Sequence, residues 1–170
     1  MTLRRIDGDY VKSPCGSSSV TITRPANTTA YADGDLFGTS PATNIEFEDI
    51  LPTAGEHYYI TDAKIEVILD AVPANMSTFT LHLYSSAPTA IADNSAWTLL
   101  AADGSKYLGS IVFTVPADLG TTLIRWEANI NIKRKLASGS TSIYGQLVTN
   151  GNYTPTSGQI IKLQLETISA

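Results

Sequence analysis

The sequence predicts an all-β domain: a jelly-roll-like β-sandwich of about eight antiparallel strands with an extended N-terminal arm. Three observations predict this class. Apolar and polar residues alternate along several segments, turn-forming residues separate those segments, and almost no segment has helical periodicity. The length of 170 residues fits one domain that can bury its own core, so no second domain is expected.

The longest alternating segment is 122–134, where every second residue from Ile124 to Ile132 is apolar and the residues between are polar. In 63–70, Ala63, Ile65 and Val67 share one face in the same way. Further strands are expected at 20–23, 45–48, 79–84, 108–115, 142–149 and 161–166. Such alternation is typical of a sheet with one face on a core and the other in water. It predicts a core position for Trp126 and a polar-face position for His82.

Turn formers fill the intervals between these segments, for example Asp33-Gly34, Pro52 to Gly55 and Asn150-Gly151. The small residues 138–140 lie between two predicted strands and indicate a tight hairpin. A short helix is expected only at 89–97. No internal repeat is present, which disfavours a propeller or a solenoid.

Residues 1–19 are polar, are interrupted by Pro and Gly and have no period, so they are interpreted as an extended arm before a sandwich domain at 20–170. The arm is either a frayed terminus or a segment that docks on a neighbouring subunit. If it docks, candidate contact residues are Arg4, Arg5, Tyr10 and Lys12. Tyr58 and Tyr59 are further candidates, because tyrosine is favoured at protein contacts, although tyrosines at the rim of the core fit equally well.

Composition and the lack of known motifs argue against nucleic-acid binding, membrane insertion, catalysis and metal binding. A net charge of −5 and a low content of basic residues disfavour nucleic-acid binding, and no apolar run is long enough to span a membrane. His57 and His82 are the only histidines; His57 lies in a turn-rich stretch and His82 on the polar face of a predicted strand, so both are expected to be exposed or half-exposed sheet residues. Cys15 lies among serines in the arm, with no histidine near it in the sequence. No zinc, EF-hand or phosphate-loop motif occurs. The sequence therefore predicts no enzyme, no catalytic residues, no cofactor and no metal site.

Three segments carry a resemblance to virion structural proteins of tailed bacteriophages: 20–35, 71–84 and 136–151. Within that group the chain most resembles head decoration (cement) proteins, small β-rich subunits that form trimers on the outside of the capsid. The resemblance implies a non-enzymatic homotrimer that binds the major capsid protein lattice across capsomer joints. It also implies a place on the outer surface of the phage head and synthesis in the cytoplasm of the bacterial host. It implies no catalytic residues.

Two alternatives stay open. A phage tail or head-fibre component would have the same composition and the same virion origin. A carbohydrate-binding β-sandwich would use an aromatic platform, for which Trp97 is the candidate because it is expected in a loop or short helix rather than in the core.

Overall fold

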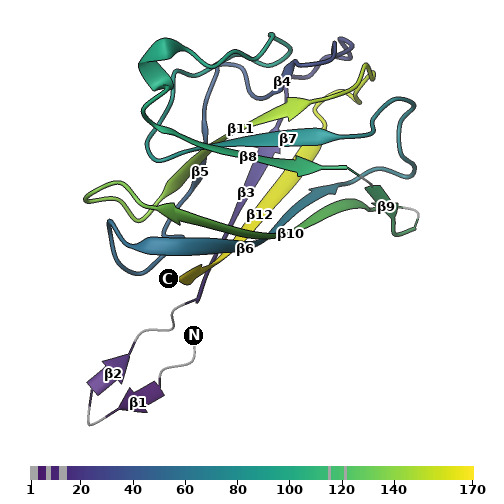
Figure 1. Cartoon of the computed structure of the whole chain (residues 1–170). Helices are drawn as coiled ribbons and strands as arrows, with labels where there is room; N and C mark the ends of the chain where they lie inside the picture. Colours follow the sequence, from purple (N-terminus) through teal and green to yellow (C-terminus); the bar gives the residue numbers. More distant parts are fainter. Residues whose placement is uncertain (1–3, 7–8, 12–14, 115, 121) are drawn as a thin grey trace.

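The structure is a computed structural model that describes residues 4–6, 9–11, 15–114, 116–120 and 122–170. Two antiparallel sheets face each other (Figure 1). The first sheet has the order β3 (Cys15–Thr23), β12 (Ile160–Ser169), β6 (His57–Val67), β10 (Ile124–Lys135) and β9 (Pro116–Asp118). The second has the order β4 (Leu36–Phe37), β11 (Ile143–Thr149), β7 (Phe79–Tyr84) and β8 (Tyr107–Phe113), with β5 (Ile45–Phe47) also paired to β11.

The strand order is that of a jelly roll. Because β4 and β5 both pair with β11, we count them as one strand of the jelly roll. The eight strands along the chain are then β3, β4/β5, β6, β7, β8, β10, β11 and β12, and β9 is an additional edge strand. The first sheet then holds the first, eighth, third and sixth strands, and the second sheet holds the second, seventh, fourth and fifth. This is the arrangement of two interlocked Greek keys. The predicted fold class is confirmed.

Two local predictions were wrong. Residues 89–97 contain no helix; the helical turn nearby is a single 3-10 turn, η1 (Ala101–Asp103). Residues 138–140 do not close a hairpin, because β10 and β11, which they connect, belong to different sheets. The chain crosses there from one layer to the other, and Gly139 takes the positive φ of 79° that the turn requires.

The strand β3 begins at Cys15, before the sequence boundary at Val20. Cys15 to Ser19 pair with Ile168 to Gln164 of β12, so they belong to the first sheet. The first residues of this strand are mostly serine and glycine, so they show no alternation of apolar and polar residues that could predict a strand. Ahead of it, β1 (Arg4–Ile6) and β2 (Asp9–Val11) pair as a small antiparallel hairpin.

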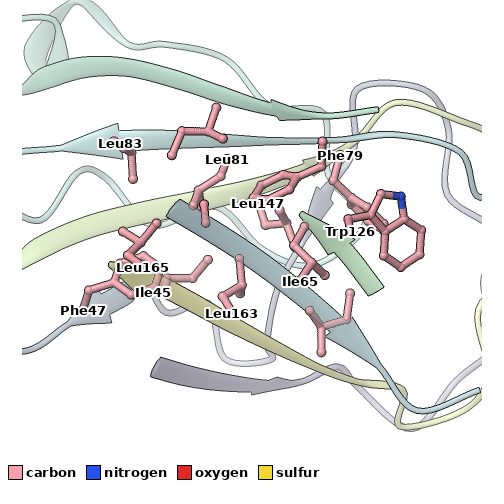
Figure 2. Packing of buried hydrophobic residues seen from close by; sticks show 14 of the residues in the cluster. Ile45, Phe47, Ile65, Phe79, Leu81, Leu83, Trp126, Leu147, Leu163 and Leu165 are labelled. Carbon is pink, nitrogen blue, oxygen red and sulfur yellow. The ribbon is translucent and has the colours of Figure 1, made fainter. Parts of the chain in front are cut away.

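The core lies between the two sheets (Figure 2). Phe79, Leu81 and Leu147 of the second sheet face Ile65 and Leu163 of the first. Trp126 is fully buried, as predicted, and its ring meets Phe79 edge to face with the centroids 5.3 Å apart. Its indole N–H donates to the carbonyl of Ser77 at 3.1 Å, so the one polar group of this large side chain is satisfied.

A change of phase in β6 determines where its tyrosines lie. Ala63, Ile65 and Val67 face the core on odd-numbered positions, but Tyr58 and Ile60 face it on even-numbered ones. Both neighbouring strands shift register opposite the intervening residues 61 and 62, as at a β-bulge. The expectation that Tyr58 contacts a partner is therefore corrected, since its ring is 0% exposed.

The Tyr58 hydroxyl is buried and makes no hydrogen bond to any described residue, and burial raises its pKa. Burial of a hydroxyl without a hydrogen-bond partner costs desolvation free energy, and no hydrogen bond offsets this cost. We expect Tyr58→Phe to leave the free energy of unfolding unchanged or to raise it by up to about 1 kcal/mol. Tyr58→Ala should lower it by about 3–5 kcal/mol because a cavity remains. Urea unfolding of both variants tests this, and a loss above about 1 kcal/mol in Tyr58→Phe would show that the hydroxyl has a partner.

Candidate functional site

Residues 85–106, which connect β7 to β8 and include η1, lie over the outer face of the second sheet (Figure 1). We call them the covering segment. The sequence pattern places Thr80, His82 and Tyr84 on a water-facing side of β7, but all three are buried. The expectation that His82 is exposed or half-exposed is therefore wrong, because the covering segment excludes water from that face.

Backbone hydrogen bonds attach the covering segment to the edge of the second sheet. Leu36 N donates to Ser95 O and Asn94 N donates to Leu36 O, both at 2.9 Å. Trp97 N donates to Gly34 O at the same distance. These hydrogen bonds and an isolated β-bridge between Asp35 and Ala96 attach the segment beside β4.

Gln146 of β11 holds the segment from below. Its Oε1 accepts hydrogen bonds from the Tyr84 hydroxyl and from the indole N–H of Trp97, both at 2.9 Å. Its Nε2 donates to the carbonyl of Thr89, also at 2.9 Å. A buried amide satisfied on both sides in this way fixes the geometry of its neighbours.

His82 packs beneath Trp97 with the two rings nearly parallel and their centroids 3.6 Å apart. Its Nδ1 lies 3.0 Å from the hydroxyl of Tyr107. Burial lowers the pKa of His82 to about 4, so the ring is neutral at neutral pH. The imidazole is thus a packing group enclosed by aromatic rings, rather than a base presented to a ligand.

Asp103 anchors the far end of the covering segment. Its carboxylate accepts from Lys106 Nζ at 2.8 Å and from Thr89 N at 2.9 Å. The hydrogen bond from Lys106 and then that from Thr89 lower the pKa of Asp103 to about 2. The carboxylate therefore stays charged and bonded at all ordinary pH values.

A buried ion pair joins the covering segment to the loop after β3. Arg24 Nη2 lies 3.1 Å from Asp93 Oδ2, and the two side chains are 0% and 5% exposed. Tyr31 completes the cluster, since Arg24 Nε donates to its hydroxyl at 3.1 Å and that hydroxyl donates to Asp93. Gly38 N also donates to Asp93. Removal of either charge would leave the other buried without its counter-ion, so this cluster favours one arrangement of the loops.

Of the contact residues that the sequence suggested, Tyr58 and Tyr59 have side chains in the described part of the structure. Arg4, Arg5 and Tyr10 belong to β1 and β2, whose side chains lie outside the described part of the structure, and Lys12 lies outside the described residues altogether. Tyr59 is half-buried on the outer face of the first sheet, with Lys133 Nζ 5.6 Å from its ring centroid.

Trp97 has one ring face occupied by His82, and its single donor is bonded to Gln146. Sugar platforms need an open ring face, and here at most one is left. The ring is thus built into the attachment of the covering segment.

Sequence reasoning missed the importance of Arg24, Asp93 and Gln146. Their partners lie on distant parts of the chain: Asp93 is 69 residues from Arg24 and Thr89 is 57 residues from Gln146. The available signal was weak, namely an arginine directly after a strand in a chain with only 16% charged residues.

Neither a metal centre nor a membrane helix is found among the described residues. No group of three or more His, Cys, Asp or Glu residues there is arranged to hold a metal ion. None of the helices in that part of the chain has the length and hydrophobicity to cross a membrane.

No family model matches the chain, and no curated protein matches it. Among solved structures, it is similar to that of Desmodium yellow mottle tymovirus, with 13% identity over 100% of this chain and 94% of the other, at a TM-score of 0.27. It is also similar to Tomato aspermy virus, with 11% identity over 96% and 82% of the two chains, at a TM-score of 0.33. The decameric BFDV capsid protein is 15% identical over 91% and 95%, at a TM-score of 0.33. TM-scores this low carry no weight for function, so the jelly-roll assignment rests on the strand order.

The buried His82 gives the fold a specific pH dependence. In the unfolded chain its pKa is near 6.5, and in the folded chain it is about 4, so the unfolded chain binds the extra proton as the pH falls. The contribution of neutral His82 to the free energy of unfolding is therefore fully present above pH 6.5. As the pH falls toward 4, the free energy of unfolding decreases by up to about 1.4 kcal/mol per pH unit.

His82→Phe keeps an aromatic ring beneath Trp97 and removes the titration. We expect its free energy of unfolding in urea to fall less steeply than that of the wild type between pH 7 and pH 4.5. Parallel curves for the two proteins would mean that the folded state accepts the proton on His82 without cost.

Proposed function

We propose that the chain is a non-enzymatic structural component of a virion, and more specifically a capsid decoration protein of a tailed phage. In this role it binds the major capsid protein lattice across capsomer joints on the outside of the head, as a homotrimer. Synthesis takes place in the cytoplasm of the bacterial host. A protein that binds only the assembled shell stabilises that shell by mass action.

One observation carries the proposal. The three segments that resemble tailed-phage virion proteins, 20–35, 71–84 and 136–151, meet at one place in the fold. Gly34 N donates to Thr149 O at 2.9 Å, and Asn150 N donates to Thr78 O at 3.1 Å. The resemblance thus covers a contiguous structural unit, and not three scattered stretches of similar composition.

The construction of the second sheet agrees with a mechanical role. Its longest connection is held by the Arg24–Asp93 ion pair, by Gln146 and by Asp103, so the fold offers a rigid body for attachment. The net charge of −5 also keeps a protein outside the shell from binding the packaged genome.

The arm is the proposed contact with a neighbouring subunit, through Arg4, Arg5, Tyr10 and Lys12. An arm that orders on contact can cover a large surface at an entropic cost. Because β3 begins at Cys15, the arm can be removed by deleting residues 1–14 without shortening the first sheet.

The test uses heads of the phage that carries this chain, stripped of their surface proteins. The full chain should co-sediment with the heads and raise the temperature at which they rupture. The chain without residues 1–14 should bind at least tenfold more weakly, which is a loss of about 1.4 kcal/mol. Binding to purified tails and not to heads would contradict decoration and favour the tail or fibre alternative; binding to neither would contradict both.

A further inference from the structure

Four aliphatic side chains form a row across the outer face of the first sheet, near the end of β6. Val67 pairs with Ile161 of β12 and with Ile124 of β10, and these three residues face the core. Ile160 is the first residue of β12, whereas Ile68 directly follows β6 and Leu123 directly precedes β10, so the strand alternation, if continued by one residue, places all three on the outer face. Leu119 continues the row beyond β10, since its N–H donates to the carbonyl of Leu123 at 2.9 Å. In lateral order the row is Ile160, Ile68, Leu123 and Leu119.

This row is exposed. Ile68 is 67% exposed, Leu119 53% and Ile160 41%, and Leu123 is half-buried. Single exposed aliphatic residues are common on protein surfaces, but four side by side at the ends of four neighbouring strands are not. Contiguous apolar surface of this kind marks a site of contact with another protein.

The charged residues beside the row are arranged in a reciprocal order. On the outer face of β6, Lys64 precedes Glu66, and in register with them on β10 lie Glu127 and Arg125. Arg125 Nη2 and Glu66 Oε1 are 2.6 Å apart within the chain. Each of these two register pairs therefore has an acid on one strand and a base on the other, and the acid changes strand from one pair to the next.

We propose that this face pairs with the same face of a second copy, around a two-fold axis that runs parallel to the strands midway between β6 and β10. Such an axis places β6 of one copy over β10 of the other. Glu66 then faces Arg125 of the second copy, and Lys64 faces its Glu127. Within the apolar row, Ile68 meets Leu123 and Ile160 meets Leu119. Every contact occurs twice, as an isologous interface requires.

The overall charge of the face supports a second copy as the partner. The chain carries −5, so most of its surface repels another copy. On this face acids and bases nearly cancel. The basic residues are Lys64, Lys133, Lys135, Lys162 and Arg125, and the acidic residues are Asp62, Glu66, Glu127 and Glu166. Two copies can thus approach here without a net electrostatic cost.

The pairing is independent of the proposed capsid role and can be tested on the purified chain. If the chain also forms a trimer through another surface, the two contacts together give six copies; otherwise the pairing gives two. In both cases loss of the two-fold contact halves the mass in solution. The measurement is the mass by light scattering after size exclusion, across a range of concentrations.

Ile68→Lys is the disrupting variant, and Val112→Lys is its matched control. Val112 is 51% exposed on β8, on the second sheet. We expect Ile68→Lys to halve the mass and Val112→Lys to leave it unchanged, with both variants folded by thermal unfolding. Equal masses for the wild type and Ile68→Lys, or the same halving in Val112→Lys, would overturn the proposal.

A charge exchange tests the reciprocal geometry and does not depend on fold stability. Glu66→Arg and Arg125→Glu should each prevent pairing of identical copies, because each places like charges opposite one another. In a mixture of the two variants, one copy carries a base at both positions and the other carries an acid at both. Opposite charges then face each other in both halves of the interface, and the full mass should return. A mixture that stays at half mass would rule out the two-fold register. Retention of the full mass by each single variant alone would rule it out as well.

Discussion

The burial of β7 on both faces is the constraint on which the rest of the structure depends. One face packs into the core between the sheets, and the other lies beneath residues 85–106. The strand has six buried residues, among them Thr80, His82 and Tyr84, whose polar groups need partners. Asn150 donates to the Thr80 hydroxyl, Tyr107 lies within hydrogen-bond distance of His82, and Gln146 accepts from Tyr84. The Arg24–Asp93 pair and Asp103 hold the covering segment in place.

This cover makes the two sheets unequal. The outer face of β7 in the second sheet is inside the protein, whereas the outer face of the first sheet remains at the surface with its apolar row and its alternating charges. The exposed apolar residues Ile68, Leu119 and Ile160 lie on the first sheet or at its ends. The cover also explains why Trp97, Tyr84 and Tyr107 make contacts within the protein.

Much of the fold could be predicted from the sequence, because period-2 alternation is a local property. The strand containing Trp126 and the outward positions of Arg125 and Glu127 followed from it directly. The position of Tyr58 did not, since a bulge at residues 61 and 62 shifts the phase and leaves no clear trace in the composition. The burial of His82 and the pairing of Arg24 with Asp93 depend on a connection that folds back over the sheet, and alternation carries no information about what covers a face.

Native-state hydrogen exchange of the covering segment tests this account most directly. The amides of Asn94 and Trp97, which donate to Leu36 and Gly34, should exchange about as slowly as the amides of β7, because segment and strand open together. The amide of the exposed Gly120, which donates to the side chain of Asp118, should exchange fast. Fast exchange at Asn94 and Trp97 with slow exchange in β7 would contradict the account, since it would make the segment a mobile loop and leave His82 accessible to water.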